Sequence, residues 1–85
     1  MMTIAFTYKN QEYKALVDEK KSASCKQFRI TIMNGELETL LYGHNVILYK
    51  NNSFQENGLV SDDQANLLAS LKAALIDLME EPVVY

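Results

Sequence analysis

The stretch FRITIMNGELETLL, residues 28–41, is the part of the chain around which the other segments can be arranged. Asn34 and Gly35 lie at its centre, between two runs in which apolar and polar side chains alternate. Asn-Gly between such runs is typical of a β-hairpin, because a type I′ turn needs positive φ at both central residues. We therefore predict two antiparallel strands, residues 27–33 and 36–42, joined by this turn.

Three further strands are predicted on either side of this hairpin. Residues 3–9 and 12–18 alternate with period two, and Asn10-Gln11 between them can form a two-residue turn. This turn sets Tyr8 opposite Tyr13, and the apolar faces of the two strands then coincide. Residues 46–50, VILYK, are β-branched and aromatic, which predicts another strand after a turn at residues 43–45. The polar residues 19–26 are expected to form a loop.

The last third of the chain carries helix signals. Ser61 and Gln64 have the spacing of a capping box, in which each side chain bonds to the main chain of the other residue. Leu68, Leu71 and Leu75 recur at helical spacing after it. Proline cannot continue a helix, so Pro82 marks its end. We predict a helix over residues 62–81 and an extended C-terminal tail over 82–85.

The order of these elements predicts an α+β fold in a single small domain, residues 1–85. It consists of an antiparallel β-meander of about five strands, with the C-terminal helix packed on one face. The predicted core comprises the side chains that share the inner face of the sheet, opposite the leucine stripe of the helix. These are Ile4, Phe6, Ala15, Val17, Phe28, Ile30, Ile32, Leu37, Leu41, Val46 and Leu48.

Composition and charge exclude several classes of protein. Hydrophobic residues make up 48% of the chain, which is too many for a disordered one. The formal net charge is −3, whereas a nucleic-acid surface needs clustered Lys and Arg. No apolar run approaches the ~18 residues of a membrane span, and no secretory signal is visible. We expect a cytoplasmic protein with neither a nucleic-acid nor a membrane partner.

No group of residues forms a catalytic, cofactor or metal motif. His44 is the only histidine and Cys25 the only cysteine, whereas a zinc site needs several such ligands. Cys25 would be a candidate nucleophile only if the fold brought His44 to it. Glu36 and Glu38 share one face of the predicted strand, where charge protects a sheet from edge pairing. The chain is therefore predicted not to be an enzyme and to need no cofactor.

One predicted surface is unusual for a small domain. On the sheet face away from the helix, strands 36–42 and 46–50 would bring Leu40, Tyr42, Ile47 and Tyr49 together, with Met33 beside them. Contiguous exposed apolar area of this kind marks a contact site. We predict protein–protein contact through this surface, with a second copy in a homodimer or with another protein. In an alternative interpretation, the tail or the loop over residues 51–60 covers it.

A second hypothesis belongs to a different functional class. A small-ligand site, catalytic or not, would lie between the helix and the rim of the sheet, near Tyr8, Tyr13 and Phe54. A cavity of roughly 300 Å³ or more with convergent polar groups would favour this hypothesis. A flat apolar patch would favour protein contact.

Overall fold

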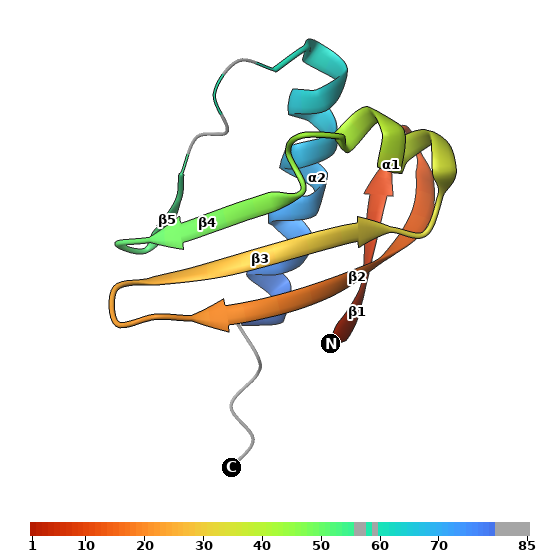
Figure 1. The fold of residues 1–85 in the computed structure, drawn as a ribbon. Helices are drawn as coiled ribbons and strands as arrows, with labels where there is room; N and C mark the ends of the chain where they lie inside the picture. The colour runs from red at the N-terminus through yellow and green to blue at the C-terminus, as the bar shows by residue number, and fades with distance from the viewer. Residues whose placement is uncertain (56–57, 59, 80–85) are drawn as a thin grey trace.

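A computed structural model describes residues 1–55, 58 and 60–79 of the chain. The elements follow in the order β1 (Met2–Tyr8), β2 (Gln11–Lys21), β3 (Cys25–Ile32), α1 (Gly35–Leu41), β4 (Val46–Lys50), β5 (Ser53–Phe54) and α2 (Asp62–Met79). The five strands form one antiparallel sheet in sequence order, and α2 lies behind this curled sheet in Figure 1. The predicted α+β fold, with a five-stranded antiparallel sheet and a C-terminal helix on one face, is confirmed.

The first hairpin keeps the predicted faces but not the predicted turn. Lys9 and Asn10 occupy the turn, both with positive φ (49° and 63°), and Tyr8 therefore pairs with Gln11 rather than with Tyr13. The register is shifted by two residues. Because side chains on a strand alternate with period two, this shift leaves every side chain on its predicted face. Ile4, Phe6, Ala15 and Val17 are accordingly buried, as predicted.

Residues 36–42 do not form the predicted strand. Asn34 has extended backbone (φ −159°), and its side-chain Oδ1 accepts a hydrogen bond from the Leu37 N–H at 3.1 Å. It is thus the N-cap of the helix α1, not the first residue of a type I′ turn. Leu37 and Leu41, four residues apart, are both buried on one side of that helix. The prediction of a hairpin at Asn34-Gly35 is wrong because capping by Asn and helical leucine spacing prevailed over the turn.

Because residues 35–41 form a helix and not the predicted strand, the side chains of β4 point to the faces opposite to those predicted. Ile47, opposite Phe28 in the register, is fully buried, while Leu48 is 40% exposed and Val46 is half-buried. The placement of Val46 and Leu48 in the core is therefore wrong, and Ile47 takes that place. The prediction depended on counting residues through a two-residue turn, and a helix between β3 and β4 removes that constraint.

The helix α1 is attached to β3 by the carboxylate of Glu38. Its Oε2 accepts from the Ile32 N–H at 2.7 Å, and its Oε1 accepts from Asn45 Nδ2 at 2.5 Å. Asn45 makes two hydrogen bonds with Ile30. Its main-chain carbonyl accepts from the Ile30 N–H at 2.8 Å, and its side-chain Nδ2 donates to the Ile30 carbonyl at 3.3 Å. Glu38 thus satisfies a β3 donor beyond the end of the pairing with β4.

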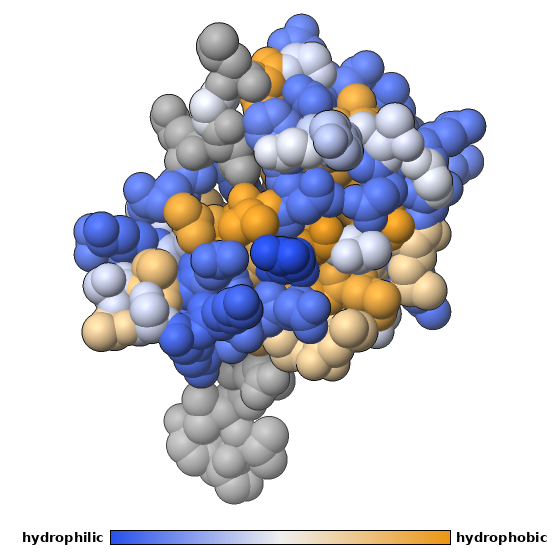
Figure 2. All heavy atoms as spheres, viewed as in Figure 1, coloured by the Kyte–Doolittle hydropathy of each residue, from blue (hydrophilic) through white to orange (hydrophobic). Residues whose placement is uncertain are grey.

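The face of the sheet turned away from α2 is the one that Figure 2 presents, and we call it the outer face. The register assigns to it the alternate side chains of each strand, including Lys14, Leu16 and Asp18 on β2. Hydrophilic residues dominate this view, with apolar atoms gathered over β4 and near the middle of the molecule. The outer face is thus polar around a limited apolar area.

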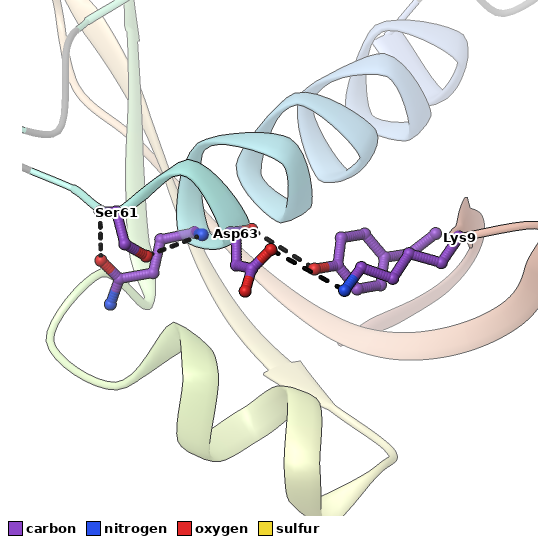
Figure 3. A network of polar contacts seen from close by, with 5 residues as sticks. Lys9, Ser61 and Asp63 are labelled. Atoms are coloured by element: carbon purple, nitrogen blue, oxygen red, sulfur yellow. Dashed lines mark hydrogen bonds and ion pairs between the residues drawn. The ribbon is translucent and has the colours of Figure 1, made fainter.

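The predicted capping box is present at the start of α2 (Figure 3). The Ser61 N–H donates to Gln64 Oε1 at 3.0 Å, and the Gln64 N–H donates to Ser61 Oγ at 3.2 Å. Gln64 Nε2 also donates to the Leu40 carbonyl at 3.0 Å, which joins α2 to α1. On the other side, Lys9 Nζ lies 3.7 Å from an Asp63 carboxylate oxygen. The start of α2 is thereby positioned by both α1 and the first turn.

Four leucines of α2 are buried against the sheet: Leu67, Leu68, Leu71 and Leu75. Leu78 and Met79, further along the helix, pack on the core with partial exposure. The helix is described as far as Met79, so its predicted end at residue 81 and the tail 82–85 lie outside the described residues. The predicted loop 19–26 is shorter than expected, because β2 continues to Lys21 and β3 begins at Cys25.

Candidate protein-contact surface

An open cleft lies on the outer face where β3 and β4 meet the turn before β4. Its volume is about 630 Å³. The walls come from β3, from the turn at residues 43–45, from β4 and from the residue that follows β5. The lining residues are Arg29, Ile30, Thr31, Gly43, His44, Asn45, Val46, Leu48 and Gln55. The cleft thus lies beside β3, where the chain leaves α1 and enters β4.

The floor of this cleft is apolar. Val46 and Leu48 are two residues apart on β4, so their side chains point to the same face. Leu48 lies opposite Gln27, and Val46 lies opposite Arg29. Leu48 is among the exposed large hydrophobic residues, at 40%. Contiguous apolar area that is exposed to water is a feature of protein-contact sites.

The rim of the cleft is polar and can donate hydrogen bonds. Arg29 and Gln55 are exposed, and His44 is half-buried. Within the described residues, no ion pair includes Arg29, although Asp18 lies directly opposite it on β2. The Asp18 carboxylate instead lies 4.0 Å from the N-terminal ammonium. The Arg29 guanidinium, with its five N–H donors, therefore has no carboxylate partner in the described part of the chain.

The five residues predicted as a contact surface do not share one face. Ile47 is fully buried, and Leu40 and Tyr49 are partly buried against the core. Met33 and Tyr42 are exposed, at 62% and 82%, where β3 leads into α1 and where α1 ends. The predicted grouping assumed a strand at residues 36–42. In the helix α1, Leu40 packs against the core, and Tyr42 at the end of the helix is exposed.

The sequence carried a signal for the helix α1 that the prediction of a strand over residues 36–42 left unused. Leu37, Leu40 and Leu41 have the i, i+3, i+4 spacing of a helix, and Glu36 and Glu38 suit a helical first turn. Had residues 35–41 been assigned to a helix, the parity of β4 would have been left open. Phe28 on β3 then needs an apolar neighbour in the core, and Ile47 provides it.

The residues named for the alternative ligand site lie apart. Tyr8 is on β1 and Phe54 is on β5, at opposite edges of the sheet. Tyr8 is buried, with its hydroxyl 3.5 Å from the Asp63 carbonyl, and Phe54 packs edge-on against Tyr49. Tyr13 stacks on Phe6. These three aromatic rings take part in packing at separate places.

Cys25 and His44 are not brought together. Cys25 begins β3 and lies opposite Lys50 at the end of β4, whereas His44 precedes the start of β4. Among the described residues, no three His, Cys, Asp or Glu side chains converge to hold a metal ion. In the same residues, neither helix has the length and apolar character needed to cross a membrane.

Comparisons with protein-family models, with curated proteins and with solved structures each found no match to this chain.

Proposed function

We propose that this chain is a small non-enzymatic domain that acts through protein–protein contact, with the outer face of β3 and β4 as the contact surface. The observation that carries this proposal is the exposure of Leu48, next to Val46, on the floor of an open cleft with polar residues around it. Interfaces commonly place apolar side chains at the centre and polar groups at the rim. A cytoplasmic location belongs to the same proposal.

A selection from a random peptide library tests this function. Peptides selected on the wild-type domain are expected to lose at least about tenfold in affinity for the Leu48→Thr variant, since a few residues near the centre of an interface carry most of the binding free energy. Threonine suits a strand, so the fold should be unchanged. Ile76→Gln is the matched control, because Ile76 on α2 is 39% exposed and Leu48 is 40% exposed. Selected peptides that bind the wild-type domain and Leu48→Thr with equal affinity would contradict the proposal.

A second copy of the chain is one form that this contact can take. In that form, light scattering coupled to size exclusion should show a dimer that Leu48→Thr converts to a monomer and Ile76→Gln does not. A monomer at millimolar concentration would exclude the homodimer and leave contact with another protein.

A small-ligand site is the second candidate function, and the size of the cleft favours it. About 630 Å³ lies within the range of small-molecule sites, and Arg29, Thr31 and His44 converge on it. Such sites usually bury most of the ligand, however, and this cleft is open to solvent over an exposed sheet face. Protein contact therefore remains the better-supported function. Tight binding of a small carboxylate such as benzoate, detected by amide shifts confined to the cleft, would reverse this ranking.

A further inference from the structure

The outer face differs in charge from the chain as a whole. The register places four cations on it, Lys14, Lys20, Arg29 and Lys50, and two carboxylates, Glu12 and Asp18, all of them exposed. The formal net charge of the full chain is −3. Acidic side chains gather elsewhere, as at Glu36 in α1 and at Asp62, Asp63 and Asp77 in α2. The outer face is thus a cationic surface on an acidic protein.

We propose that the partner of this surface is an acidic segment of another protein, in which one carboxylate pairs with Arg29 and a neighbouring apolar side chain packs on Leu48. This inference rests on the protein-contact function proposed above and names the chemistry of the partner. Extended segments suit such a site, because their side chains alternate and present charged and apolar groups at fixed spacing.

Arg29 is the residue that defines the charge of the partner. Arg29 lines the cleft and lies opposite Val46 in the register, and its guanidinium forms no ion pair within the described residues. Planar guanidinium groups bind carboxylates through two parallel hydrogen bonds, which gives both strength and direction. Thr31 and His44, on the same cleft, provide further side chains that can donate hydrogen bonds to an anionic group.

The charge pattern favours an acidic partner over a second copy of the chain. Symmetric pairing of two outer faces would bring the cationic surface of one copy against that of the other, and like charges across an interface oppose association. An acidic segment meets the same surface with complementary charge, which also raises the association rate.

Nucleic acid is the other anionic partner to consider, and the outer face suits it less well. Single strands bind where bases stack on aromatic side chains. The register places Tyr49, Phe28 and Tyr13 on the inner face, and no aromatic side chain of β1 to β5 points to the outer one. An acidic peptide needs only the guanidinium and the apolar floor.

A peptide-display selection with charge-reversed protein tests the inference. A random twelve-residue library is selected in parallel on the wild-type domain and on the Arg29→Glu variant. Peptides from the wild-type selection should be enriched in Asp and Glu relative to the starting library. Their affinity should fall at least about tenfold on Arg29→Glu, in line with the strength of hydrogen bonds between charged groups. Peptides from the Arg29→Glu selection should have the opposite bias, toward Lys and Arg.

The outcomes separate this inference from the proposed function. Selected peptides that depend on Leu48 but show no acidic bias and tolerate Arg29→Glu would overturn the acidic partner and keep protein contact. Peptides that depend on neither residue, or a library that gives no binder on this face, would overturn both. A labelled twelve-nucleotide single-stranded DNA that binds more tightly than the selected peptides would overturn the inference in favour of nucleic acid. Matched circular dichroism spectra of both variants would show that the fold is retained.

Discussion

Two asparagines of this chain stand at points where a tight turn was expected, and only one of them forms a turn. Asn10 follows Lys9 in a turn with both φ values positive, and β1 and β2 pair directly on either side of it. Asn34 precedes a glycine, which makes it the better turn candidate by composition. It nevertheless has extended backbone and caps α1. Asn10 contributes its tolerance of positive φ, whereas Asn34 contributes a side-chain oxygen that accepts from the Leu37 N–H.

The difference lies in the residues that follow each asparagine. After Asn10, the residues Tyr13, Ala15 and Val17 alternate with polar ones, so a strand buries them on one face. After Asn34, the apolar positions are Leu37, Leu40 and Leu41, and only a helix places all three on one side. A turn signal therefore has to be judged with the periodicity of the segment after it.

The largest loss of stability is expected at β4, where α1 leaves Ile47 pointing into the core and Leu48 pointing to solvent. Ile47→Ala should destabilise the domain by about 2–5 kcal/mol, because it leaves a cavity beside Phe28 in the core. Leu48→Ala, one residue away on the exposed face, should change the stability by no more than about 0.5 kcal/mol. Urea unfolding of both variants measures the difference. Equal losses of stability for the two variants would contradict an inward Ile47 and an outward Leu48.

An intermediate effect is expected at the contact that holds α1 to the sheet. Glu38→Ala removes the acceptor of the Ile32 N–H and should cost about 1–3 kcal/mol, the penalty of an unsatisfied donor that is partly shielded from water. Glu38→Gln retains one side-chain oxygen and should cost less. Glu36→Ala, at an exposed position of the same helix, serves as the control. A Glu38→Ala variant as stable as the control would show that the contact contributes nothing.

The smallest effects are expected at Gly35 and Asn10, and they should have opposite signs. Gly35 begins α1 without positive φ, and a Cβ at this position would meet no atom within 4 Å. Gly35→Ala should therefore be neutral or stabilise the domain by up to about 1 kcal/mol. A type I′ turn at this glycine would predict the opposite sign. Asn10→Ala, where φ is 63°, should destabilise by about 1–2 kcal/mol. Thermal unfolding of the two variants gives both signs.

Much of the fold could be predicted because its signals are local. The inner side chains of β1, β2 and β3 follow from period-two alternation alone, and even a turn misplaced by one residue leaves Phe6 and Val17 on their correct face. The capping box at Ser61 and Gln64 was predictable from four adjacent residues. In both cases the deciding interaction lies within a few residues of the pattern.

The contact surface could not be predicted in the same way. Its residues depend on the orientation of β4, and that orientation follows from how α1 ends and where Asn45 bonds to Ile30. Val46, Ile47 and Leu48 are all apolar, so their own sequence does not tell which of them points inward. The inward residue of β4 is the one that lies opposite the buried Phe28, which is far away in sequence.

The fold class, the inner faces of the first three strands and the helix α2 with its cap follow from the sequence, because periodicity and capping act within one segment. Only the tertiary structure decided that residues 35–41 are a helix, that Ile47 rather than Leu48 enters the core, and that Arg29 lies beside an exposed apolar floor. These features depend on contacts between segments, in which Glu38 of α1 accepts a hydrogen bond from Ile32 of β3 and β4 pairs with β3. Local preference allowed both a strand and a helix after Asn34, and only the helix packs Leu40 against the core on the same side as Leu37 and Leu41.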